Sequence, residues 1–280
     1  MVEDYFISFD KLRLFYRYIT SEGFRVCLVL VHGLGEHSGR YINFFQRFSG
    51  LGYSVYALDL RGHGRSQGRR GHIMAFSDYL KDIKLFMEFV GNMSKSKYYF
   101  MVSHSMGGLI AVRYAQEYGT QGETGLSGLI VSSPLLKIRV QVPKIKMLLG
   151  RAVSRFIPWL SMSNELDPAF LSHDTSVVHA YIQDPLVHTK VTARWFTEII
   201  KSMRQSFENA CNLTIPCLFL HAGDDHLADP EGTRSLFPLI ASKDKELKVY
   251  EGFYHELFNE PRKEQVFSDI EGWLRRVIQS

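Results

Sequence analysis

The fold of this chain is decided by the stretch YYFMVSHSMGG at residues 98–108, together with the helical pattern that follows it at residues 109–118. An apolar run ends in small residues and leads directly into a helix. A nucleophile elbow requires this context, because a sharp turn from strand to helix projects a serine hydroxyl above the sheet. The elbow pattern Gly-x-Ser-x-Gly has Ser103 in place of its first glycine, and it makes Ser105 the candidate nucleophile. Taken alone, the same residues also suit an ordinary turn at the end of a strand.

A nucleophilic serine needs a general base, and that base needs a carboxylate to orient it. In chains with an elbow, the acid and then the histidine follow the serine in the sequence. Only His255 of the 11 histidines lies beyond the last apolar run. The acid is expected after the run at residues 217–220, where Asp224, Asp225 and Asp229 stand. Asp229 precedes a proline, as a helix N-cap does, and is therefore set aside. Of the two remaining aspartates, we predict Asp225 as the acid in preference to Asp224.

Two backbone amides are expected to form an oxyanion hole. The apolar run at residues 26–31 ends in the loop His-Gly-Leu-Gly at residues 32–35, whose N–H groups can face a tetrahedral oxyanion. The donors expected at an elbow are the amide after the nucleophile, that of Met106, and one from this loop, which we assign to Leu34.

The same loop also imitates a dinucleotide-binding fingerprint. Gly33 and Gly35 follow a strand, and Asp59 closes the next strand. The third glycine, Gly39, comes one residue too late for that motif. A nucleotide site would also leave the elbow serine and the late histidine without a role, so the hydrolytic interpretation is favoured.

Apolar runs alternate with helical patterns along most of the chain. Runs without internal alternation are typical of strands that are covered on both faces. Strand and helix in repeated succession predict an α/β fold with a mostly parallel sheet of about eight strands. An N-terminal hairpin is expected at residues 5–19. The runs lie at residues 26–31, 55–60, 98–102, 126–132, 217–220 and 247–250.

The alternation breaks once, at residues 134–210, where helical stretches occur without a convincing strand. An insertion of this size is expected to form a helical cap over the carboxyl edge of the sheet, where ligands bind in such folds. The predicted division is therefore a core of residues 1–133 and 211–280 with a cap of residues 134–210.

A basic amphipathic helix is predicted in the cap from Pro143 to Trp159. Lys144, Arg151 and Arg155 share one of its faces, and apolar side chains line another. Such a helix suits peripheral contact with a membrane or a lipid aggregate. The alternative is a cap helix that packs its apolar side onto the core.

Composition limits the class of protein. The chain has 280 residues, 45% hydrophobic and 22% charged, which is typical of a folded domain with a large core. It contains no apolar run of about 18 residues that could span a bilayer, and acids near its start argue against a cleaved secretion signal. Three cysteines without a Cys-x-x-Cys spacing indicate neither structural zinc nor a disulfide framework, so a cytoplasmic location is expected.

The net charge of +4 is concentrated in two basic segments, at residues 60–72 and 134–160. Local positive charge on an otherwise acidic body favours an anionic surface or substrate and argues against a nucleic acid partner. For the first segment, a structural loop beside the site is the favoured interpretation.

Five motifs resemble those of the monoacylglycerol lipases and bacterial lysophospholipases of the α/β-hydrolase superfamily. They occur in the family's order over nearly the whole chain. The motifs are HGLGEHSGRY (32–41), DLRGHGRS (59–66), the elbow at Ser105, DPLV (184–187) and HELFNE (255–260).

This resemblance implies an α/β-hydrolase fold with a triad of Ser105, Asp225 and His255, and oxyanion donors at Leu34 and Met106. It further implies that Glu36 and Arg40 lie near the pocket for the glycerol part of the substrate. A local ion pair that braces the loop is an equally good interpretation of these two residues.

The sequence therefore predicts a serine hydrolase that cleaves carboxylic esters of lipid-like substrates, monoacylglycerol or lysophospholipid, without metal or cofactor. Two alternatives keep the triad, namely an acyltransferase and a proline-type aminopeptidase. A third is a non-catalytic hydrolase-like receptor, which is disfavoured because such proteins usually lack a member of the triad.

Overall fold

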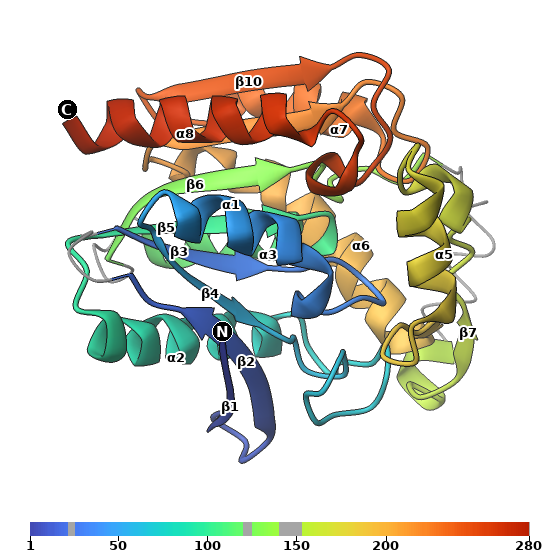
Figure 1. The fold of residues 1–280 in the computed structure, drawn as a ribbon. Helices are drawn as coiled ribbons and strands as arrows, with labels where there is room; N and C mark the ends of the chain where they lie inside the picture. The colour runs from blue at the N-terminus through green and yellow to red at the C-terminus, as the bar shows by residue number, and fades with distance from the viewer. Residues whose placement is uncertain (22–25, 120–124, 140–152, 280) are drawn as a thin grey trace.

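The centre of the structure is an eight-stranded, mostly parallel sheet with helices on both faces (Figure 1). This computed structural model describes residues 1–21, 26–119, 125–139 and 153–279. Strand order is β1-β2-β4-β3-β5-β6-β9-β10; β2 runs antiparallel to its neighbours β1 and β4, and the other pairs are parallel. The predicted α/β architecture is confirmed. The strands are β1 (Val2–Ile7), β2 (Arg13–Ile19), β3 (Val26–Val31), β4 (Ser54–Leu58), β5 (Tyr98–His104), β6 (Leu126–Ser132), β9 (Cys217–Ala222) and β10 (Lys245–Tyr250).

The central strands are apolar throughout because both of their faces are covered. Every residue of β3, β4 and β9 is buried. Alternate residues of β3 enter opposite layers, since Leu28 and Leu30 pack in one core cluster and Val29 and Val31 in the other. The predicted N-terminal hairpin is confirmed as the pair β1–β2 at the edge of the sheet.

Helices form the two outer layers of the core. On one face, α1 and α8 pack phenylalanines and Trp273 against the sheet, whereas α2, α3 and α6 cover the other face. Asp229 accepts a hydrogen bond from the Glu231 amide at 3.0 Å, which confirms it as the N-cap of α7. The helices around the sheet are α1 (Ile42–Gly50), α2 (Ser77–Ser94), α3 (Met106–Tyr118), α6 (Ala193–Glu208), α7 (Pro230–Leu236) and α8 (Lys263–Gln279).

The inserted residues after β6 contain helix α5 (Thr175–Gln183) and a small antiparallel sheet of β7 (Ser161–Ser163) and β8 (Lys190–Thr192). The expectation of no strand in this insertion is wrong, because strands of three residues are too short to produce a readable pattern. In Figure 1, α5 and β7 lie beyond the carboxyl ends of the parallel strands. Helix α6 contacts α3 of the core. The division into core and cap at residues 134 and 210 stays a prediction.

Most of the basic helix predicted from Pro143, including Lys144 and Arg151, lies outside the described residues. Its last part is described: residues 153–156 are helical, and Arg155 is exposed. In the described ranges, no helix is both long and apolar enough to cross a membrane.

The basic segment at residues 60–72 forms a loop whose residues 60–64 are buried and whose residues 67–70 are exposed. Arg61 is buried between two carboxylates, with Nε 2.6 Å from Asp82 and Nη1 2.9 Å from Asp10. Arg65 pairs with Glu3 at 2.7 Å. Because local acids neutralise these two arginines, the segment fits the structural interpretation. All three cysteines are free.

Candidate active site

Ser105 occupies a strained turn between β5 and α3. Its φ of 54° and ψ of −119° are unusual for a residue with a side chain, and such strain costs about 1–3 kcal/mol. Gly107 allows the turn, because a Cβ there would lie 2.3 Å from the Val31 carbonyl oxygen. Ser103 fits in place of the usual glycine, since its hydroxyl donates to the Ile130 carbonyl at 3.1 Å. The turn thus has the geometry of a nucleophile elbow.

Asp225 and His255 meet although 30 residues separate them. His255 Nδ1 lies 2.7 Å from Asp225 Oδ2, and both side chains are buried. The other oxygen, Oδ1, accepts the amides of Leu227 at 2.8 Å and Ala228 at 2.9 Å. Asp224 is exposed. Of the two neighbouring aspartates, therefore, Asp225 is the one that contacts the histidine.

Asp225 and His255 each favour the charged form of the other. Burial alone would raise the pKa of Asp225, but the charge and hydrogen bond of His255, together with His221, hold it far below its usual range. Burial alone would lower the pKa of His255, but Asp225 outweighs burial and raises it. An ionised acid beside a histidine of raised pKa is suited to general base catalysis.

A small pocket brings Ser105 and His255 together with the loop after β3. Leucines form much of its wall, and a polar end contains Glu36, Arg40 and Glu256. Tyr181 of α5 closes that end, with its ring 4.6 Å from the Arg40 guanidinium. The leucines are Leu34, Leu135, Leu166, Leu171 and Leu227.

In the loop after β3, hydrogen bonds among the described residues engage the amide of Gly33 but not that of Leu34. His32 Nδ1 lies 2.7 Å from the Gly33 carbonyl oxygen, and Nε2 accepts the Leu60 amide at 2.9 Å. Burial lowers the pKa of His32 to about 4, so it is neutral at pH 7. The Gly33 amide donates to Glu36, whereas no partner among the described residues takes the amides of Leu34 and Met106. These two free amides are the ones expected at an oxyanion hole.

Glu36 and Arg40 form part of a buried ionic cluster that the sequence did not reveal in full. Arg40 Nη1 lies 3.0 Å from Glu36 Oε2, and Nη2 lies 2.9 Å from Glu256 Oε2. Burial raises the pKa of Glu36, although Arg40 opposes the rise. Burial would also raise the pKa of Glu256, but Arg40 outweighs it and lowers that pKa. A carboxylate directly after His255 was the available signal for Glu256.

The inserted segment directly contacts the residues between β10 and α8 that carry His255, residues 251–262, which we call the histidine loop. The amide of Glu256 donates to the Leu171 carbonyl at 2.9 Å, and the Ser172 hydroxyl donates to the Asn259 carbonyl at 2.9 Å. On the other side, His37 Nε2 lies 2.8 Å from Asp184 Oδ2. These contacts make the residues around 171 and 184 walls of the site.

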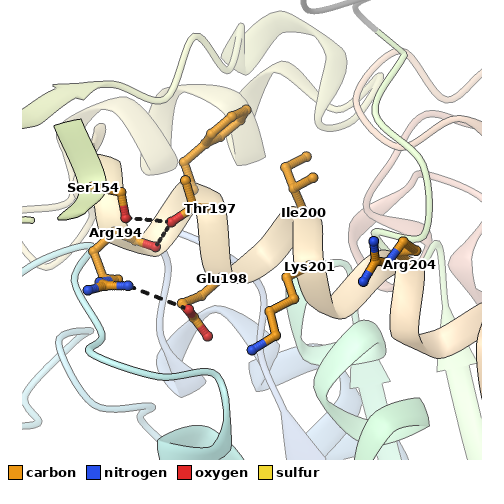
Figure 2. A pocket seen from close by; sticks show the side chains of 8 residues that line it. Ser154, Arg194, Thr197, Glu198, Ile200, Lys201 and Arg204 are labelled. Atoms are coloured by element: carbon orange, nitrogen blue, oxygen red, sulfur yellow. Dashed lines mark hydrogen bonds and ion pairs between the residues drawn. The ribbon is translucent and has the colours of Figure 1, made fainter. Parts of the chain in front are cut away.

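A larger hollow lies on α6 and contains none of the predicted catalytic residues (Figure 2). It presents Arg194, Lys201 and Arg204 beside Glu198. No group of side chains suited to hold a metal ion occurs in residues 1–21, 26–119, 125–139 and 153–279. The small pocket at Ser105 is therefore the candidate active site.

Comparisons with known proteins agree with this geometry. The model of the Hydrolase_4 family, described as serine aminopeptidase, S33, matches residues 24–262. Monoacylglycerol lipase of Mycolicibacterium smegmatis is 36% identical over 251 residues, 89% of this chain and 88% of that protein. Phospholipase YtpA of Bacillus subtilis is 32% identical over 252 residues, 90% of this chain and 95% of that protein. The crystal structure of Paleococcus ferrophilus monoacylglycerol lipase is similar with a TM-score of 0.85 at 35% identity, covering 95% of this chain and 99% of that one.

Proposed function

Because the chain belongs to the α/β-hydrolase family described as serine aminopeptidase, S33, we propose that it hydrolyses carboxylic esters of lipid-like substrates. The contact of 2.7 Å between Asp225 and His255, in a pocket shared with the elbow serine, is the observation that carries the proposal. The relatives named as monoacylglycerol lipase and phospholipase support the same class of substrate.

The proposed reaction proceeds through an acyl-enzyme. Ser105 Oγ attacks the ester carbonyl carbon while His255 Nε2 accepts its proton, and Asp225 holds the Nδ1–H tautomer. The amides of Leu34 and Met106 stabilise the oxyanion of the tetrahedral intermediate. His255 returns the proton to the departing alcohol, and a water activated by the same histidine then releases the carboxylic acid.

The two ends of the pocket support a substrate with an apolar acyl part and a polar alcohol part. The leucine wall suits an acyl chain, because its side chains are apolar. Glu36 and Arg40 lie at the polar end, where we propose that the head group of a monoacylglycerol or lysophospholipid binds.

An aminopeptidase activity is less well supported. A substrate ammonium group needs an acid that is available for it. Among the pocket residues that the structure describes, Glu36 and Glu256 are both paired with Arg40. Acyl transfer instead of hydrolysis stays open as an alternative, and product analysis with and without an acceptor alcohol separates the two.

We extend the proposal to peripheral contact of the cap with a membrane. Phe156 is 75% exposed and Trp159 is 54% exposed, and Ile157, Leu160 and Met162 beside them are also exposed. Aromatic and aliphatic side chains beside a basic residue, Arg155, suit a lipid surface. The cytoplasmic location and the absence of a nucleic acid partner stay predictions.

One hydrolysis panel tests the function. It compares p-nitrophenyl esters, monoacylglycerols, lysophospholipids and aminoacyl substrates, with wild type and Ser105→Ala. We expect ester hydrolysis by the wild type, and neither hydrolysis nor covalent labelling by a fluorophosphonate probe for Ser105→Ala. Full labelling of that variant would show that another residue is the nucleophile. Preferential cleavage of aminoacyl substrates would overturn the esterase proposal.

A further inference from the structure

Arg40 joins the loop that carries Leu34 to the loop that carries His255. Its Nη1 contacts Glu36 Oε2 at 3.0 Å, and its guanidinium makes a two-point contact with Glu256, in which Nη2 lies 2.9 Å from Oε2. The side chain of Arg40 is 8% exposed, and those of the two glutamates are 4% exposed. We call the side chains of Glu36, Arg40 and Glu256 the Arg40 bridge.

At one end, the bridge fixes the residues between β3 and α1, residues 32–41, which we call the oxyanion loop. Glu36 Oε1 accepts the Gly33 amide at 2.6 Å and the Tyr41 hydroxyl at 2.6 Å. The Gly33 amide is therefore committed to Glu36, while the next amide, that of Leu34, remains available to the pocket. The Glu36 carboxylate thus removes the Gly33 amide from the possible oxyanion donors and holds the loop beside Leu34 in place.

At the other end, the bridge fixes the histidine loop. Glu256 directly follows His255, and its carboxylate also accepts a hydrogen bond from Asn259 Nδ2 at 2.9 Å. A two-point contact between guanidinium and carboxylate fixes direction as well as distance. Because Arg40 holds both ends, the amide of Leu34 and the ring of His255 keep a set position relative to each other.

The charges of the bridge do not balance. Two carboxylates share one guanidinium, and the oxygens of Glu36 also contact the Gly33 amide and the Tyr41 hydroxyl. His104 adds no charge, because burial lowers its pKa to about 3. Both Glu256 and Glu36 act to raise the pKa of His255, in the same direction as Asp225. The titratable and charged groups that face His255 are Asp225 with His221 behind it, His104 from β5, Glu36 and Arg40 from the oxyanion loop, and Glu256 from its own loop.

We propose that the Arg40 bridge is a positioning device, and that its Glu256 carboxylate stabilises the imidazolium of His255 that forms during attack by Ser105. The inference rests on the proposed function, because it takes His255 as the general base. Asp225 acts through the Nδ1 hydrogen bond, whereas Glu256 acts through space and through Arg40. Glu256 is thereby a positioning residue for the reaction, because it acts through His255 and Arg40.

The test is the pH profile of kcat/KM for a short soluble ester, measured with Glu256→Gln. Glutamine keeps the shape and can keep the contact with Arg40, but it removes the negative charge. A base that has lost a nearby anion binds its proton less tightly, so the acid limb should move to lower pH by about half a unit or more. At the pH optimum we expect kcat to fall about tenfold with KM nearly unchanged.

Glu271→Gln is the matched control, because Glu271 is likewise a carboxylate paired with arginine, with Arg47 at 2.8 Å and with Arg275, but lies on α8. It should keep the wild-type profile. An unchanged acid limb in Glu256→Gln, or a raised KM with kcat retained, would overturn the inference.

A second variant separates the effect of the negative charge from that of the two-point contact with Arg40. Glu256→Asp keeps the charge but is too short for the two-point contact, so the acid limb should stay near that of the wild type while kcat falls. This variant also provides the test if Glu256→Gln does not fold. Retained kcat in a folded Glu256→Asp would overturn the positioning role. Activity that persists in Ser105→Ala would instead refute the proposed function, so the two failures are distinguishable.

Discussion

Replacing Asp225 by asparagine tests the proposed acid with almost no change in shape. The structure dictates how the new amide would be oriented. Asp225 Oδ1 accepts two amides, those of Leu227 and Ala228, so the carbonyl oxygen of an asparagine must stay on that side. Its NH₂ group would then occupy the place of Oδ2, 2.7 Å from His255 Nδ1. A donor in this place selects the tautomer with the proton on Nε2, which cannot accept a proton from serine.

The expected loss follows from this wrong tautomer and from the missing charge beside the imidazolium. Comparable changes in serine hydrolase triads cost on the order of 10⁴ in kcat, which corresponds to about 5 kcal/mol. The assay is steady-state hydrolysis of a soluble p-nitrophenyl ester, with thermal unfolding as a check of the fold. Asp224→Asn is the matched control, because Asp224 is exposed, and it should retain most activity. Loss of activity in Asp224→Asn and not in Asp225→Asn would refute the assignment of the acid.

Two further predictions concern the elbow and the cap. Gly107→Ala should lower the free energy of unfolding by about 1–3 kcal/mol, measured by denaturant titration, because the new Cβ would clash with the Val31 carbonyl; an unchanged stability would contradict this. Phe156→Ser combined with Trp159→Ser should weaken vesicle binding and slow hydrolysis of aggregated lipid on the order of tenfold, with little effect on a soluble ester. Leu239→Ser, at a site 52% exposed outside the cap, is the control, and equal losses on both substrates would mean that the aromatic pair supports the pocket instead.

The elements that the sequence predicted well are those whose physics is local. Strand β3 is a run of buried residues because both of its faces are covered, and that burial is visible as an uninterrupted apolar run. The N-cap of α7 is readable from Asp229 before a proline, because capping involves neighbouring residues. The elbow is likewise readable, because the small residues around Ser105 satisfy a local steric demand.

What the sequence could not predict depends on long-range or very short features. Strands β7 and β8 have three residues each, which is too few for a periodic signal. The contacts of the inserted segment with the histidine loop use backbone carbonyls such as that of Leu171, and a backbone atom has no sequence signature. Tyr181 reaches Arg40 across a large sequence separation, so its cation–π contact follows from the fold alone.

The Arg40 bridge explains why two interpretations of Glu36 and Arg40 looked equally good from sequence. The spacing of four residues suits a local ion pair, and the motif resembles that of a head-group pocket. Neither interpretation contains Glu256, which lies 216 residues away from Arg40 in sequence. Its carboxylate links a local pair on one loop to the residue beside His255. The two interpretations are therefore compatible. The buried guanidinium of Arg40 braces the oxyanion loop, and the side chains around it form the polar end of the pocket.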